Sequence, residues 1–197
     1  VGQDLIAVGD LMGLFDSILG RSQPPKPDLD QLFGLPSAAI TLQVSLGAVP
    51  TGAGSVAFRA PEGKAFADVV ADVKQLLTAT SDPDLEVTQD SFGYTWITVR
   101  AADISDVVNG LHAINVSIQD AGFGPQLLCS LVAFERDDRR FAMVYLYKRG
   151  SFYPFAPIAE PQRDSVLELQ LRDLLRDDLN VEQDLTRWFP VWGAPGL

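Results

Sequence analysis

The stretch Gly122–Pro157, GFGPQLLCSLVAFERDDRRFAMVYLYKRGSFYPFAP, decides the fold that we predict for this chain. It contains two apolar runs, Leu127–Phe134 and Phe141–Tyr147, separated by the charged residues 135–140. Two antiparallel strands joined by a polar turn account for this order. Apolar residues occupy both alternating sides of each run, which indicates strands in the middle of a sheet that is covered on both faces.

The segments before this hairpin predict further strands and helices. Ala38–Leu46 alternates between apolar and polar residues and is predicted to be a strand, followed by a turn at Gly47–Gly54 and a returning strand at Ser55–Arg59. Apolar residues recur at helical spacing in Ala65–Leu77 and in Ile104–Ile118, so both segments are predicted to be helices.

Between these helices, the segments Glu86–Gln89 and Phe92–Arg100 predict a second hairpin, with Tyr94 and Trp96 on one face. After the central hairpin, prolines indicate that the aromatic segment Gly150–Pro157 either lies at a sheet edge or leaves the sheet. Asp164–Leu179 predicts the last helix.

Helices separated by hairpins favour an antiparallel sheet with helices gathered on one side. The predicted fold class is therefore α+β: a single domain, mainly an antiparallel sheet of about six strands with helices on one side, plus a tethered N-terminal amphipathic helix. The predicted organisation is a helix in residues 1–21, a proline-rich linker in 22–27, and a globular α+β domain with an aromatic C-terminal tail in 28–197.

Both ends of the chain carry candidate partner-binding residues. A helix over Leu5–Leu19 would gather apolar residues on one side, away from its aspartates, and a protein groove suits this charge better than an anionic lipid surface. Disordered tails avoid aromatic residues, so the tail Arg187–Leu197 is expected to dock on the body or on a partner. The candidates are Leu11, Leu14, Phe15, Ile18, Leu19, Trp188, Phe189 and Trp192.

A second candidate site lies where the central hairpin ends. Basic and aromatic side chains gather there, and they form either a pocket for an anionic or planar ligand or an ordinary core edge with surface ion pairs. The candidate pocket residues are Tyr147, Lys148, Arg149, Tyr153 and Arg163.

Composition argues against several classes of function. The net charge of −11 repels nucleic acid, and no apolar run reaches the roughly 20 residues that a membrane-spanning helix needs. Cys129 and His112 are the only residues of their kinds, and we interpret them as buried and half-buried structural residues rather than as a catalytic pair. We expect no catalytic constellation, no cofactor and no metal site.

Several stretches together resemble one known family. They include MGLFDSILGR at 12–21, LPSAAITLQ at 35–43, VYLYKRG at 144–150 and RWFPVWGAPGL at 187–197, and with Gly122–Phe134 they extend over nearly the whole chain from Met12. These stretches resemble PspAB, a family of actinobacterial proteins associated with the phage-shock protein PspA.

The resemblance implies a non-enzymatic interaction or adaptor protein of the cell-envelope stress response, which binds a PspA-like membrane-remodelling partner. The absence of a membrane-spanning run and of a secretory-signal pattern at the N-terminus predicts a cytoplasmic protein. The resemblance implies that it is peripheral to the inner face of the membrane through that partner. One alternative is a small-ligand sensor or cryptic enzyme that uses the region of Lys148, Arg149 and the tyrosines. Another is that both ends of the chain complete the core or a homodimer.

Overall fold

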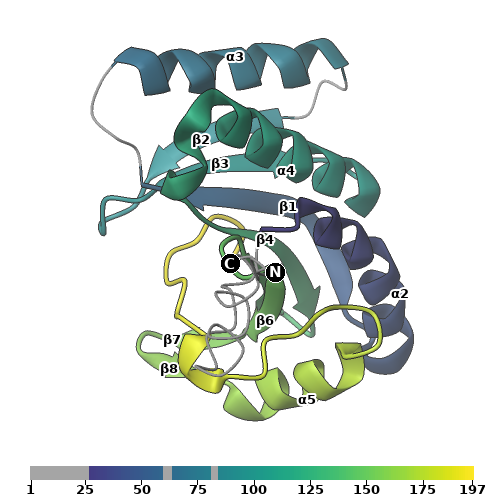
Figure 1. Cartoon of the computed structure of the whole chain (residues 1–197). Coiled ribbons are helices and arrows are strands. Elements are labelled where there is room, and N and C mark those ends of the chain that lie inside the picture. Colours follow the sequence, from purple (N-terminus) through teal and green to yellow (C-terminus); the bar gives the residue numbers. More distant parts are fainter. Residues whose placement is uncertain (1–26, 60–63, 81–83) are drawn as a thin grey trace, which may run out of the picture.

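The computed structural model describes residues 27–59, 64–80 and 84–197. Six strands form one antiparallel sheet in the order β2-β3-β1-β4-β5-β6, and helices complete an α+β fold (Figure 1), as predicted. In chain order the elements are η1 (Leu29–Gly34), α2 (Leu35–Leu46), β1 (Val49–Phe58), α3 (Lys64–Thr80), β2 (Asp84–Gln89), β3 (Thr95–Arg100), α4 (Ile104–Ile118), η2 (Gln119–Phe123), η3 (Gly124–Gln126), β4 (Leu127–Arg136), β5 (Arg139–Leu146), β6 (Ser151–Phe155), β7 (Pro157–Ala159), β8 (Gln162–Arg163), α5 (Ser165–Leu175) and η4 (Leu185–Arg187).

The hairpin of β4 and β5 lies inside the sheet, as its two-sided apolar pattern predicted. The two strands pair from Cys129 opposite Leu146 to the turn, and β4 is flanked on its other side by β1. The short aromatic strand β6 forms the edge beyond β5, which is one of the two positions predicted for it. A central strand needs apolar residues on both sides because both faces of the sheet are covered.

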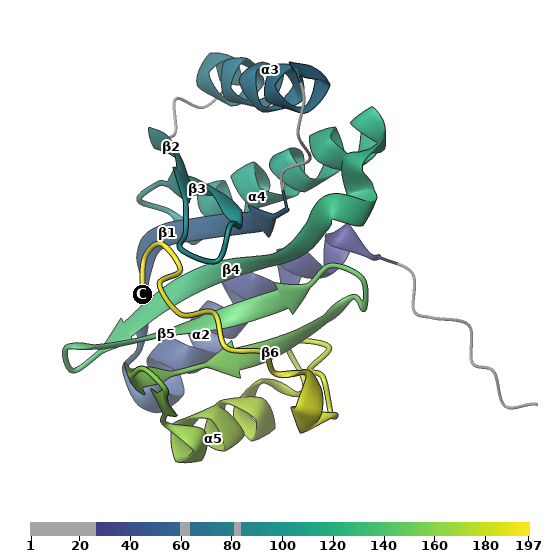
Figure 2. The same ribbon diagram turned by 90° about the vertical axis from the view of Figure 1, so that its left-hand side faces the viewer.

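The two faces of the sheet have different covers, which Figure 2 separates: α2 and α4 lie behind the sheet and the C-terminal residues cross in front of it. On β4, Ser130 faces α4, where it accepts a hydrogen bond from Asn115 Nδ2 at 2.8 Å. Its neighbours along the strand point the other way, and Ala133 on that face lies against Gly196. We call these surfaces the helix face and the tail face.

The helix face is packed mainly by α4. Asp103 caps this helix, accepting a hydrogen bond from the Ser105 N–H at 2.6 Å, and Val107, Leu111 and Ile114 are fully buried. Gly54 of β1 allows the close approach, because an added Cβ would lie 2.6 Å from Val107 Cγ1. Outside this layer, α3 lies over α4, while α5 lies along the β6 edge (Figures 1 and 2).

The predicted strand over Ala38–Leu46 is wrong, because this segment forms helix α2. Its alternating residues fit a strand, but Leu35, Ala38, Ala39 and Leu42 recur at helical spacing and form the buried side of α2. Pro36 occupies the first turn, and Gly47 ends the helix in the left-handed conformation with φ of 69°.

The predicted turn at Gly47–Gly54 is also wrong, because most of it belongs to β1. The register of β1 against β4 shifts between Pro50 and Gly54, where Gly52 has φ of 76°. Glycine and proline here mark a bulge within a strand rather than a turn between strands. The predicted helix in residues 1–21 and the linker up to residue 26 lie outside the described residues.

Candidate functional site

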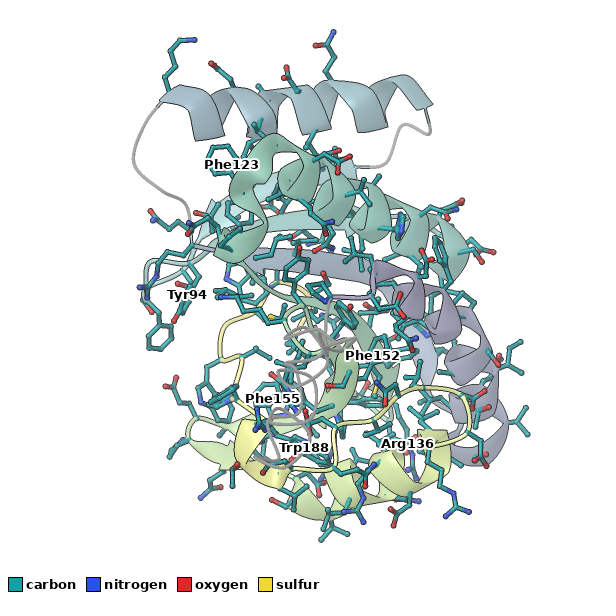
Figure 3. The ribbon with its side chains drawn as sticks, in the orientation of Figure 1. Tyr94, Phe123, Arg136, Phe152, Phe155 and Trp188 are labelled. Carbon is teal, nitrogen blue, oxygen red and sulfur yellow. The ribbon has the colours of Figure 1, made fainter. Side chains whose placement is uncertain are left out.

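The last ten residues cross the tail face and are held there by their aromatic side chains. Trp188 is 7% exposed, stacks on Tyr153 with ring centres 6.2 Å apart, and donates a hydrogen bond from Nε1 to the Glu182 carbonyl at 3.0 Å. Trp192 meets the Phe155 ring edge-on at 4.9 Å. Phe155 and Trp188 both lie at the β6 side of the molecule (Figure 3). The aromatic tail therefore docks on the body, one of the two positions expected for it.

Side chains from the body also hold the tail backbone. The Tyr153 hydroxyl donates to the Phe189 carbonyl at 2.7 Å, and Arg163 Nη1 donates to the Trp188 carbonyl at 2.7 Å. Near the end of the chain, Arg140 Nη1 donates to the Gly196 carbonyl at 3.3 Å. Three side chains of the body thus bind three carbonyls of the tail, and these bonds fix its path.

Arg163 joins the tail to helix α5 through a buried ion pair. Its Nε donates to Glu168 Oε1 at 2.9 Å, and its guanidinium lies 4.9 Å from the centre of the Phe155 ring. Glu168 is 4% exposed and also accepts the Ala156 N–H at 2.8 Å. Burial raises the pKa of Glu168, and the Ala156 and Arg163 hydrogen bonds oppose that rise.

A pocket of about 500 Å³ lies on the tail face between the sheet, the turn of the β2–β3 hairpin and the first part of the tail. This volume lies within the range of about 300–1,000 Å³ that is typical of small-molecule sites. Most of its lining is apolar or aromatic: Ala57, Phe92, Tyr94, Trp96, Leu128, Cys129, Leu146, Tyr153, Phe189, Pro190, Val191 and Trp192. Tyr94 lies on the left of the view in Figure 3, above the β6 region.

Polar groups in the pocket wall are largely occupied by other protein groups. Asp90 accepts hydrogen bonds from the Phe92 and Tyr94 N–H groups and from Trp96 Nε1, each at 2.9 Å. The Tyr153 hydroxyl donates to the tail. Because these donors and acceptors are satisfied within the chain, the interior offers mainly apolar contact.

Three basic side chains, Lys148, Arg149 and Arg187, complete the lining. Arg149 pairs with Glu182 and Arg187 pairs with Asp184, in both cases through Nε. Burial favours the neutral form of Glu182, but the Asp184 N–H and the Arg149 guanidinium hold the pKa of this carboxyl below its usual value. Lys148 is exposed and makes no ion pair within the described part of the chain.

The five residues predicted to form a ligand pocket are not all brought together. Lys148, Arg149 and Tyr153 line the pocket. Tyr147 points to the opposite face of the sheet, where its hydroxyl donates to Gln119 Oε1 at 2.8 Å. Arg163 is engaged by Glu168 and the tail and is not part of the lining.

The pocket also contains residues that were not predicted as site residues, notably Phe92, Tyr94 and Trp96. The sequence placed Tyr94 and Trp96 on one face of a hairpin, and Trp96 of β3 lies opposite Ala57 of β1. This shared face was the sequence feature that could have indicated these residues. Nothing in the hairpin sequence itself showed that the face lies near Cys129 of β4.

Cys129 and His112 lie on opposite sides of the sheet and do not form a pair. Cys129 is 7% exposed on the tail face, and burial raises the pKa of its thiol to about 12. His112 belongs to α4, with its ring 4.8 Å from that of Phe33 and Nε2 3.4 Å from Asp30 Oδ1. Across residues 27–59, 64–80 and 84–197, no three His, Cys, Asp or Glu side chains cluster as metal ligands would.

The predicted partner-binding residues fall in different environments. In the tail, Trp188 is buried, Trp192 is half-buried and Phe189 is 60% exposed. The five in the N-terminal segment, Leu11, Leu14, Phe15, Ile18 and Leu19, lie outside the described residues.

The helix that follows this N-terminal segment has an apolar outer side. Phe33, Ile40 and Val44 are 47%, 65% and 82% exposed. Ile40 and Val44, four residues apart, lie on one side of α2, and Phe33 of the preceding 3-10 helix η1 adds an exposed ring that also packs on His112. We call these three residues the α2 ridge. Helix α2 therefore carries apolar residues on its outer side as well as its buried side.

The comparisons with known proteins agree with the resemblance in the sequence. No helix in the described part of the chain is both long and apolar enough to cross a membrane. No curated protein matches the chain significantly. The family model described as PspA associated protein B matches residues 12–196, nearly the whole chain, and this protein therefore belongs to the PspAB family.

Proposed function

We propose that this protein is a non-enzymatic interaction protein of the cell-envelope stress response, and that it binds a PspA-like partner. The family description supports the association with PspA. The observation that carries the proposal is the α2 ridge, formed by Phe33, Ile40 and Val44. Single exposed apolar residues are common on proteins, but a row of them at helical spacing is typical of a surface that another helix or groove covers.

The position of the α2 ridge in the chain supports the same function. The N-terminal segment with the candidates Leu11, Leu14, Phe15, Ile18 and Leu19 joins the body at Pro27, directly before η1 and α2. A partner on the ridge would therefore be within reach of that segment. We propose that both contribute to binding, and that the protein is cytoplasmic and reaches the inner face of the membrane through this partner.

Co-purification of the full chain with a PspA-like protein from the same organism tests this function. We expect Ile40→Glu and Val44→Glu to abolish co-purification, because each places a charge on the apolar contact. Deleting residues 1–21 should weaken it. Val166→Glu is the matched control, since Val166 is 80% exposed and belongs to α5 rather than to the ridge.

The free energy of unfolding of each substituted variant should lie within about 0.5 kcal/mol of that of the wild type, because the substituted side chains are exposed. Retention of the partner by both ridge variants and by the truncated chain would refute this surface. Equal loss with Val166→Glu would show a general effect of added charge.

A further inference from the structure

We propose that the pocket under the C-terminal tail binds a long-chain carboxylate, with the acyl chain between the sheet and the tail and the carboxylate at Lys148. The pocket is distinct from the α2 ridge, because its lining comes from the tail face while α2 lies behind the sheet (Figure 2). The proposal therefore stands or falls independently of partner binding.

The lining determines the apolar part of the ligand. Ala57, Cys129 and Leu146 form the floor on three neighbouring strands, and aromatic rings from the hairpin and the tail form the walls. The indole of Trp96 and the hydroxyl of Tyr153 already have acceptors in the chain. A polar ligand would lose its hydrogen bonds to water without replacement, whereas an alkyl chain gains from every methylene that it buries.

The charge of the lining determines the head group. The whole chain has a net charge of −11, yet three basic residues, Lys148, Arg149 and Arg187, line this pocket. Arg149 and Arg187 are already paired with Glu182 and Asp184, which leaves Lys148 for the head group. The single acidic lining residue, Asp90, already accepts three hydrogen bonds. Lys148 is exposed without an ion-pair partner among the described residues, and its ammonium is free to pair with a carboxylate.

The tail forms one wall, so its aromatic residues take part in binding. Phe189 is 60% exposed, although its carbonyl is held by Tyr153 and the preceding Trp188 is buried. A ring on a fixed backbone with a free outer side can close over an alkyl chain at little conformational cost.

Titration of the full chain with saturated carboxylates of increasing length tests the proposal. Binding is followed by the fluorescence of the pocket tryptophans Trp96 and Trp192 and by protection of Cys129 from alkylation. We expect the Kd to fall roughly tenfold for every two added methylene groups until the pocket is full. Alcohols and trimethylammonium amphiphiles of equal length should bind more weakly than the carboxylates.

Two variants separate the two parts of the site. Lys148→Gln should weaken carboxylate binding several-fold and leave alcohol binding unchanged, and Lys64→Gln on α3 is the control on an exposed lysine outside the lining. Ala57→Leu should abolish binding by filling the floor. If this variant fails to fold, Val191→Trp fills the same space from the tail.

Affinity that does not depend on chain length, or equal binding of the cationic amphiphiles, would overturn the proposal. So would unchanged binding in a folded pocket-filling variant. If the chain binds phosphatidylglycerol vesicles but does not respond to dispersed carboxylates, the basic lining residues contact a membrane surface instead, and the proposal is also overturned.

Discussion

Replacing Arg163 with methionine should destabilise the protein strongly, and by an amount that depends on pH. Arg163 and Glu168 are 19% and 5% exposed in their side chains, so water screens this pair little. Methionine keeps part of the packing on Phe155 but leaves the Glu168 carboxylate without its cation and the Trp188 carbonyl without its donor. Breaking a buried pair in this way costs about 3–5 kcal/mol at neutral pH.

The pH dependence follows from the raised pKa of Glu168. Burial raises this pKa above its usual 4.5 even with Arg163 present, and removal of the cation raises it further. A carboxyl with a raised pKa in the folded state stabilises the protein below its unfolded pKa, and that stability is lost as the pH rises through the folded pKa. The loss of stability in the variant should therefore be smallest near pH 4.5, where the Glu168 carboxyl is largely protonated, and reach its full size at neutral and alkaline pH.

Urea unfolding followed by tryptophan fluorescence, at about pH 5 and about pH 8, measures the loss at both ends of this range. The double variant Arg163→Met with Glu168→Gln should recover part of the stability at high pH, because a neutral amide needs no cation. Arg172→Met removes a more exposed pair with Asp173, which water screens, and should cost much less stability than Arg163→Met. A loss at Arg163 below about 1 kcal/mol, or an equal loss at both pH values, would refute the reasoning.

Three further variants or reactions test other parts of the fold. Trp188→Ala should lower the free energy of unfolding by about 3–5 kcal/mol because the ring is buried, whereas Phe189→Ala should change it by no more than about 0.5 kcal/mol; similar losses in urea titrations would contradict the docked tail. Gly54→Ala should cost about 1–3 kcal/mol by driving a methyl group against Val107, and an unchanged urea midpoint would show that α4 can move away. Because burial raises the pKa of Cys129 to about 12, its alkylation rate, measured by mass spectrometry, should keep rising through about pH 10; a plateau at the usual thiol pKa would indicate an exposed thiol.

The candidate site could be predicted only in part, because its residues come from segments that are far apart in the sequence. Lys148, Arg149 and Tyr153 are close in sequence, and their shared position after the central hairpin predicted their proximity. Phe92 and Trp192 reach the same pocket from a distant hairpin and from the tail. Arg163 does not line the predicted pocket, because it pairs with Glu168, a partner that the sequence spacing did not indicate.

Local patterns by themselves determined much of the fold of this PspAB protein. The two-sided apolar pattern of Leu127–Phe134 and Phe141–Tyr147 predicted central strands, because a strand buried on both faces has no polar side. The helical spacing of Ile104–Ile118 predicted α4. These features depend on the period of one segment, which the sequence displays directly.

Only the tertiary structure decided features that depend on contacts between distant segments. The apolar residues of Ala38–Leu46 are compatible with the period of a strand and with that of a helix. The segment forms a helix, in which Ala38 and Leu42 pack in the core while Ile40 and Val44 remain outside. The tail gained a fixed path only through distant partners such as Tyr153 and Arg140. The pocket lies between the first part of the tail and the sheet. It results from the packing of distant segments, which no single segment encodes.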